Sequence, residues 1–383
     1  MPGPLNGIKV LEFAGIGPGP FAGMMLADLG ADVLRIDRLG ADPADDWWRR
    51  HDILSRGRRS VLVNLKQPEA VELVLDLCAG ADALIEGFRP GVLERLGLGP
   101  DVVLARNPAL VYGRMTGWGQ DGPLAQRAGH DINYTALTGV LHSVGAHDGP
   151  PIPPLNLVGD FGGGGMLLAL GVVSGILAAR SSGPGQVVDA AMVDGSALLM
   201  AWTATLRNAG RWSEQRGSNL LDGGAPNYTT YRAADGEYLA VGAMERQFFI
   251  VLLDRLGLPP ERADDVAEPA MWPALRADLA AVFASRSRAE WIELLTGLDA
   301  CVTPVLSMSD AIADAHLAHR AVLVGDADNY QPAPAPRFSA TPAGQPGPPV
   351  LPGTDGAAAL IDWGVAADRV AALRASGVVQ ATG

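Results

Sequence analysis

Two short stretches of the chain carry side chains that can transfer a proton. In the first, His130 follows Gly129 and precedes residues 132–144, whose pattern predicts a helix. In the second, Asp160 precedes a run of glycines at the head of a long apolar segment. Both side chains would lie beside backbone N–H groups that have no partner at a helix N-terminus. This arrangement suits proton transfer at a carbon next to a carbonyl group, because fixed N–H donors stabilise the developing enolate.

Each residue also has an ordinary structural interpretation. His130 can be a histidine that only caps a helix, and Asp160 can be a plain N-cap. The local sequence leaves both interpretations open. Potential metal ligands do not recur at any recognised spacing, so we expect neither a metal nor another cofactor.

The elements that precede these two stretches alternate between strand and helix. Strand patterns separated by turns and helices occur at 8–14, 32–37, 60–65, 82–86 and 110–115. This alternation predicts an α/β fold with a Rossmann-like parallel sheet, and such sheets bind ligands at the carboxyl ends of their strands. We assign residues 1–200 to the first part of this large domain.

The first glycine turn resembles a dinucleotide-binding loop. Gly17, Gly19 and Ala22 have the required spacing, and Asp37 lies about 20 residues further on, where an acid would bind ribose. The loop prolines, Pro18 and Pro20, remove N–H groups that a pyrophosphate would need. A nucleotide-binding oxidoreductase is therefore a weaker alternative.

A smaller α+β domain is predicted at 225–325. A hairpin pattern with an Asp-Gly turn spans 228–243 and is followed by a helix at 246–256. Residues 326–383 read as a proline-rich linker and a helix that returns to the large domain. One uncharged segment, 161–179, is long enough to cross a membrane, but we favour a buried helix.

Composition limits the function classes. The chain has 383 residues, 48% of them hydrophobic, and a formal net charge of −13. That charge argues against a nucleic-acid partner, and no membrane partner is expected. The two cysteines form no disulfide framework, the N-terminus lacks a signal pattern, and Ala381-Thr382-Gly383 is no peroxisomal address. These observations predict a protein of the reducing cytosol.

The two proton-transfer stretches also carry a family resemblance. Gly129-His130-Asp131-Ile132-Asn133-Tyr134, followed by Pro153-Pro154-Leu155-Asn156-Leu157 and Asp160, resembles the family III CoA transferases, and within them the α-methylacyl-CoA racemases. The resemblance implies an isomerase that interconverts (R)- and (S)-2-methylacyl-CoA by two-base proton transfer, with His130 and Asp160 as the acid/base pair. Glu245 matches a glutamate that pairs with this histidine.

The same resemblance leaves alternatives and implies further contacts. Transferase relatives usually lack the histidine and use the aspartate as a nucleophile, so acyl-CoA:carboxylate CoA transfer through Asp160 is the main alternative. A CoA-binding protein without catalysis is another. An interlocked homodimer is implied as well. CoA contacts are expected at Ile16, Arg38, Val63, Asn64, Leu65, Lys66, Gly87, Phe88, Arg89, Arg95, Gly129, His130, Asp131, Ile132, Asn133 and Tyr134, although racemases carry aspartate in place of Asn64.

Overall fold

The chain forms two compact units. The computed structural model describes residues 3–40, 46–181, 183–326 and 328–380, so the C-terminal tripeptide lies outside it. The first unit combines Met1–Thr138, Leu155–Met200 and Ala321–Gly383, and the second combines Gly139–Pro154 and Ala201–Arg320. The boundaries predicted from the sequence are 1–200, 225–325 and 326–383. They differ from these units because residues 139–154 and 201–224 group with the second unit.

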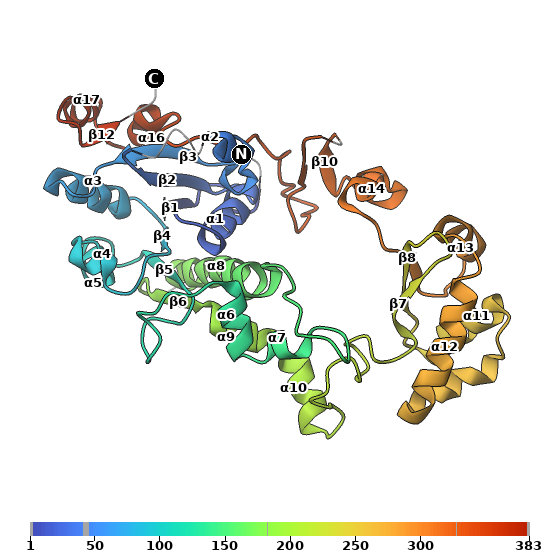
Figure 1. Cartoon of the computed structure of the whole chain (residues 1–383). Helices are drawn as coiled ribbons and strands as arrows, with labels where there is room; N and C mark the ends of the chain where they lie inside the picture. Colours follow the sequence, from blue (N-terminus) through green and yellow to red (C-terminus); the bar gives the residue numbers. More distant parts are fainter. Residues whose placement is uncertain (1–2, 41–45, 182, 327, 381–383) are drawn as a thin grey trace. The chain divides into compact units, whose positions relative to one another are not determined.

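A seven-stranded sheet forms the centre of the first unit. Its strands follow the order β12-β3-β2-β1-β4-β5-β6, and in Figure 1 β3 lies above β1 and β6 lies below it. Six strands are parallel, and only β12 runs antiparallel to its neighbour β3. The strand bounds are β1 Lys9–Phe13, β2 Asp32–Arg38, β3 Arg59–Val63, β4 Ala83–Glu86, β5 Val111–Thr116, β6 Val187–Ala191 and β12 Val379–Gln380. The predicted Rossmann-like sheet is confirmed, and its order reverses between β1 and β4.

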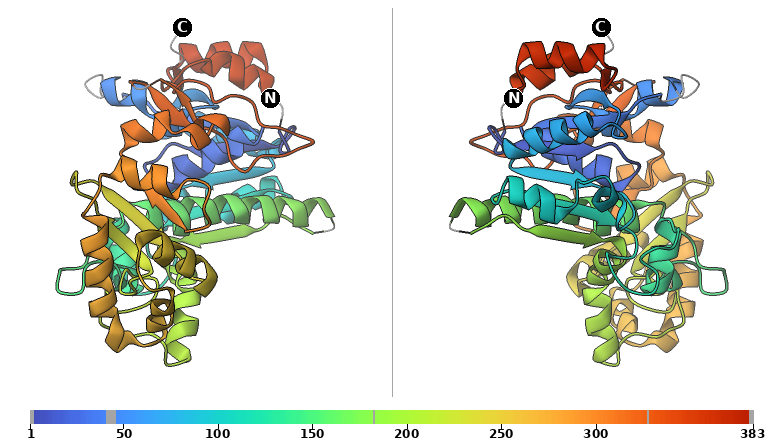
Figure 2. Two further views of the ribbon diagram at one scale, coloured as in Figure 1. Left: turned by 90° about the vertical axis from the view of Figure 1, so that its right-hand side faces the viewer. Right: turned by 90° about the vertical axis from the view of Figure 1, so that its left-hand side faces the viewer.

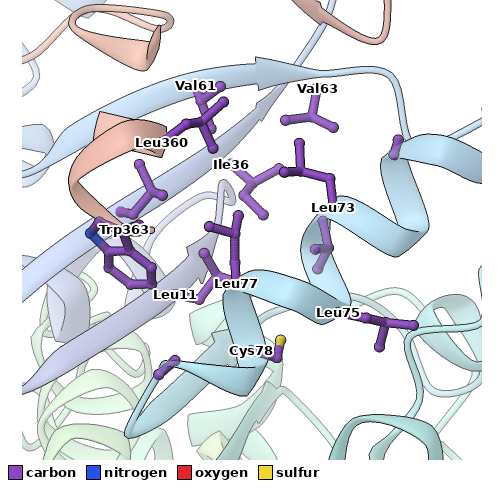
Figure 3. Close-up of a cluster of buried hydrophobic side chains, with 14 of the residues drawn as sticks. Leu11, Ile36, Val61, Val63, Leu73, Leu75, Leu77, Cys78, Leu360 and Trp363 are labelled. Carbon is purple, nitrogen blue, oxygen red and sulfur yellow. The ribbon is translucent and has the colours of Figure 1, made fainter. Parts of the chain in front are cut away.

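Helices cover both faces of this sheet (Figure 2). Consecutive strand residues point to opposite faces, so Val10 packs in one hydrophobic cluster and Leu11 in the other. Figure 3 shows the second cluster, in which Leu77 and Trp363 lie near Leu11. The first face carries α1 Pro18–Asp28 and α8 Met166–Ser181. The other carries α3 Pro68–Ala79, α5 Pro100–Arg106, α16 Gly356–Asp362 and α17 Ala367–Ala375.

Shorter elements connect these layers. In the first unit they are α2 Asp46–His51, a 3-10 helix at Ile53–Ser55, α4 Val92–Arg95, α6 Asp131–Leu137, α9 Met192–Leu199, β10 Leu323–Gly325 and β11 Tyr330–Pro332. The C-terminal segment is held to the rest of this unit by a hydrogen bond and an ion pair. Arg56 contacts Asp28 at 2.6 Å and the Pro332 carbonyl at 2.8 Å, and Arg59 contacts Asp362 at 2.6 Å. The predicted return of the chain to its large domain thus ends in β12, which completes the sheet edge.

The second unit contains a three-stranded antiparallel sheet. Its strands are β7 Tyr228–Arg232, β8 Tyr238–Gly242 and β9 Val302–Pro304, and Gly236 has the positive φ, 86°, that the predicted hairpin turn requires. The helices are α7 Val140–Ser143, α10 Ala201–Asn208, α11 Arg246–Leu256, α12 Trp272–Phe283, α13 Arg288–Leu295, α14 Met308–Ala313 and α15 Ala315–His319, with 3-10 helices at Pro260–Ala267 and Pro269–Met271. Phe249, Phe283 and Trp291 lie in its core. This is the predicted α+β domain.

Two helical stretches are broken where the chain passes from one unit to the other. The helix predicted at 132–144 ends at Leu137, because Gly139 adopts a left-handed conformation with φ 82° before α7 begins. The helical stretch from Met192 to Asn208 is likewise divided into α9 and α10 at Met200. Both breaks coincide with a unit boundary.

A π-helix, Leu157–Gly165, precedes α8 without interruption. Its glycines allow backbone contact with α9 and α1: a Cβ at Gly195 would lie 1.9 Å from the Gly163 carbonyl oxygen, and one at Gly165 would lie 2.6 Å from the Pro18 carbonyl oxygen. The segment Leu157–Ser181 is long and apolar enough to span a membrane, and 44% of its most apolar window is buried. The prediction of a buried helix therefore describes only one side of it.

Candidate active site

A cavity of about 340 Å³ opens at the carboxyl ends of β1, β4 and β5. It lies where the strand order reverses, which is the usual ligand site of an open α/β sheet. Eight of the residues expected to act in catalysis or binding line it: Ile16, Gly87, Phe88, Arg89, Gly129, His130, Tyr134 and Asp160. These residues are far apart in sequence but come together at this edge of the first unit.

His130 is the N-cap residue of α6, as predicted. The Asn133 side chain closes the cap, because its oxygen accepts a hydrogen bond from the His130 backbone N–H at 3.0 Å. The Asn133 N–H in turn donates to the His130 carbonyl at 2.8 Å. The cap thus uses the His130 backbone, and the exposed imidazole lines the cavity.

Asp160 lies in the first turn of the π-helix and is not its N-cap, because Asn156 holds that position. The Asn156 side chain donates to the Asp160 carboxylate at 3.2 Å, and the Asp160 backbone N–H donates to Asp131 Oδ2 at 2.8 Å. A Cβ at Gly17 would lie 3.3 Å from Asp160 Oδ2. The carboxylate therefore faces the first glycine turn, and the glycine at position 17 leaves room for it.

The surroundings of Asp160 favour its protonated form. Burial raises the pKa of this carboxyl group, and the neighbouring Asp131 charge raises the pKa further. The hydrogen bond from Asn156 and the charge of His130 act in the opposite direction but do not cancel the rise. A carboxyl group with a raised pKa can serve as an acid in one direction of a reaction and as a base in the other.

Tyr134 forms part of the cavity wall beside Asp160. Its ring packs edge-on against Trp118, with ring centroids 4.7 Å apart. Gly117 must be a glycine, because a Cβ there would lie 2.3 Å from the Tyr134 hydroxyl oxygen. Burial and the nearby Asp160 raise the pKa of Tyr134, so its hydroxyl group stays protonated at neutral pH.

Two buried ion pairs support the cavity, and their partners are too far apart in sequence to be predicted from it. Arg58 Nη1 contacts both carboxylate oxygens of Glu12 at 2.6 Å and donates to the Pro20 carbonyl at 3.2 Å, which fixes the glycine turn. Glu86 accepts from Arg114 Nε at 3.0 Å and from the Phe88 N–H at 2.7 Å. In the sequence, the only sign of these pairs is a single acidic residue in each of two apolar strands, Glu12 in β1 and Glu86 in β4.

Burial raises the pKa of Glu12 and of Glu86, and the charges of their arginine partners oppose that rise. Removing one partner would leave an uncompensated charge in the interior, which is strongly destabilising. The two pairs therefore fix the Gly15–Pro20 and Gly87–Arg89 turns, both of which line the cavity.

The remaining expected CoA contacts do not line this cavity. Arg38 is the last residue of β2, and Asn64 and Lys66 follow the end of β3 at the same sheet edge; Arg38 and Lys66 are exposed. The Val63 side chain is buried in the core of Figure 3, so only its backbone is open to a ligand. Leu65 packs against that core, Arg95 ends the short helix α4, Asp131 is buried and Ile132 is exposed.

Asp37 does not have the free carboxylate of a ribose-binding acid. Arg35 contacts it at 2.6 Å, and the Ser60 hydroxyl donates to it at 2.6 Å. This network joins β2 to β3 and to the Gly353 N–H, which donates to Ser60 Oγ at 2.8 Å. Together with the loop prolines, it argues against dinucleotide binding.

Glu245 belongs to the second unit and is the N-cap residue of α11. The prediction that a helix begins at this acid is therefore confirmed. Its side chain is exposed, and its pairing with His130 stays a prediction. Within the described ranges, no group of three or more His, Cys, Asp or Glu residues is arranged to hold a metal ion.

Comparison with known proteins shows to which family the chain belongs. The model of CoA-transferase family III matches residues 5–355. Relatives named alpha-methylacyl-CoA racemase are 46% identical over 340 residues in Mus musculus and 44% identical over 342 residues in Homo sapiens, each covering 88% of this chain and 87% of the relative. The crystal structure of a CAIB/BAIF family protein from Brucella suis matches with a TM-score of 0.80 at 28% identity, covering 95% of this chain and 100% of that one. The chain belongs to CoA-transferase family III.

Proposed function

We propose that this protein is an α-methylacyl-CoA racemase that interconverts (R)- and (S)-2-methylacyl-CoA thioesters. The observation that carries the proposal is that His130 and Asp160 line one cavity at the switch point of the sheet. The two racemases at 46% and 44% identity favour this activity over transfer of CoA between carboxylates.

The reaction is a two-base proton transfer. One of the two residues removes the α-proton from one face of the thioester, and the other returns a proton to the opposite face. The intermediate is an enolate, whose oxygen is stabilised by backbone N–H groups near the site. Because the reaction runs both ways, His130 and Asp160 each serve as acid and as base, and Glu245 supports the charged form of His130.

CoA binds along the carboxyl edge of the sheet in this proposal. Arg38 ends β2, Lys66 follows β3 and Arg89 follows β4, and all three supply positive charge for phosphate groups along that edge. Such a local positive patch is needed because the chain as a whole carries a net charge of −13. The Gly87–Arg89 turn, fixed by Glu86, brings the CoA site next to the cavity.

Isotope exchange tests the proposed reaction directly. The protein is incubated in heavy water with pure (R)- or (S)-2-methylacyl-CoA, and the α-carbon is analysed by mass spectrometry and chiral separation. We expect deuterium at the α-carbon together with loss of optical purity from either enantiomer. A thioester that keeps both its α-proton and its configuration would contradict the racemase assignment.

We further propose that the protein is a cytosolic homodimer. Met166, Leu170 and Leu177 form an exposed apolar stripe along α8, with 50%, 62% and 68% of their surfaces accessible. An exposed apolar surface of this kind is typical of a protein–protein interface, and we propose that a second copy of the chain binds it. The free thiols of Cys78 and Cys301 are compatible with a reducing compartment.

Solution mass tests the dimer. Analytical ultracentrifugation should give twice the mass of the chain, and Leu170→Asp should shift the protein toward the monomer, because an uncompensated charge would be buried at the interface. The exposed Leu298→Asp in the second unit serves as a matched control. A wild-type protein that sediments as a monomer at micromolar concentration would contradict this assignment.

A further inference from the structure

Asp131 connects the two proposed bases. It follows His130 directly in the chain and begins α6, and its Oδ2 atom accepts the backbone N–H of Asp160 at 2.8 Å. The contact with the π-helix is tight, because a Cβ at Gly159 would lie only 2.5 Å from Asp131 Oδ2. The Asp131 side chain thus links the start of α6, next to His130, to the π-helix that contains Asp160.

The environment of Asp131 is unusual for an aspartate. Only 8% of the residue is exposed, and its Oδ1 atom is buried with no hydrogen-bond partner among the described residues. An ionised carboxylate with one unpaired oxygen is costly to bury. A chain that only needed an acceptor for the Asp160 N–H would meet that need with a neutral side chain. The hydrogen bond alone therefore does not account for an aspartate at this position.

We infer that Asp131 is a positioning residue for the proposed racemase, which holds His130 and Asp160 at a fixed separation and keeps a negative charge beside the Asp160 carboxyl group. This inference rests on the proposed function for its catalytic meaning. It differs from the expected role of Asp131 as a CoA contact, because the observed partner of its side chain is the π-helix.

Asp131 and His130 are the two residues whose charges act on the Asp160 carboxyl group. Both affect the pKa of Asp160, with Asp131 raising it and His130 lowering it, and Tyr134 also lies within electrostatic range. Other ionisable groups occur on the elements packed against the π-helix. Three of these are paired elsewhere, Asp28 with Arg56, Arg114 with Glu86 and Arg180 with Asp82, and the others are Tyr112, Asp189 and Asp194.

Two substitutions separate the charge from the hydrogen bond. In Asp131→Asn an amide oxygen can still accept the Asp160 N–H, but the negative charge is gone, so the pKa of Asp160 should fall. In Asp131→Ala both are lost, and the π-helix is free to shift relative to α6. We expect kcat to fall about 100-fold in the alanine variant, as for a misplaced catalytic group, with KM nearly unchanged.

The asparagine variant has a distinctive pH signature. Racemisation in either direction needs one of the two residues, His130 or Asp160, to be protonated and the other to be deprotonated. Activity at low pH is therefore lost when both become protonated, so the acid limb of the rate profile reports the Asp160 carboxyl group. Losing the Asp131 charge should move that limb to lower pH in both directions. Carbon-13 NMR titration of the Asp160 carboxyl should show the same downward change without any substrate. Asp194→Asn, which removes an exposed charge from α9, should change neither measurement.

The outcomes distinguish this inference from the proposed function. An unchanged Asp160 titration in Asp131→Asn would overturn the electrostatic role, whether or not the wild type is a racemase. A racemising wild type whose Asp131→Ala variant changed KM alone would make Asp131 a CoA contact and overturn the positioning role. A wild type without α-proton exchange would end the racemase proposal, while the titration would still decide whether Asp131 and Asp160 are coupled.

Discussion

Replacing His130 with alanine should abolish racemisation in both directions while leaving slow α-proton exchange in one enantiomer. Each direction uses His130 once, as base or as acid, so neither direction can be completed without it. Loss of a general acid or base costs about 10²- to 10⁴-fold in rate, and we expect racemisation to fall about 10³-fold or more. The remaining exchange comes from Asp160, which can still remove the proton that faces it.

The measurement follows each enantiomer separately in heavy water. Deuterium at the α-carbon reports proton removal, and chiral separation reports completed racemisation. His147→Ala is the matched control, because His147 is an exposed histidine of the second unit that pairs with Asp148. A His130→Ala variant that racemised at the wild-type rate would show that this imidazole is only part of a helix cap.

Replacing Asp160 with asparagine should give the complementary result. The amide is almost isosteric with the carboxyl group but cannot exchange the proton, so racemisation should again fall about 10³-fold or more. Slow exchange should remain in the opposite enantiomer, where His130 removes the proton. The reason is geometric, because the two residues approach the α-carbon from opposite faces in the proposed reaction.

Asp160→Asn also separates racemisation from CoA transfer. A transferase would form a mixed anhydride on Asp160, which hydroxylamine would trap in the wild type and not in the variant. We expect no such adduct in either protein. A trapped adduct on wild-type Asp160, or a variant pair that both exchanged the same enantiomer, would contradict the two-base assignment.

Local patterns predicted much of the fold. The parallel sheet followed from apolar strand runs that alternate with helices, since both faces of each strand are buried. The position of His130 at a helix start followed from the glycine before it and the helical run after it. Both predictions depend on residues close together in sequence, where the chain's own periodicity carries the information.

Features that depend on distant partners could not be predicted. Asp160 reads as a cap before a glycine run, but those glycines are needed for contact with Gly195 and Pro18, far away in the chain. Glu12 and Glu86 read as isolated acids in apolar strands until Arg58 and Arg114 are placed beside them. The local sequence allows Gly139 either to continue the helix or to end it in a left-handed conformation. The structure has the left-handed conformation, at the boundary between the two units.

The position of β12 has a consequence for folding during synthesis on the ribosome. The edge of the sheet at β3 receives its last neighbour only from Val379 and Gln380, whereas β3 itself ends at Val63. At roughly 5–20 residues per second of synthesis, tens of seconds pass between the two. The edge of the sheet at β3 therefore stays open while residues 201–320 are synthesised, and this edge is completed only when Val379 and Gln380 pair with β3.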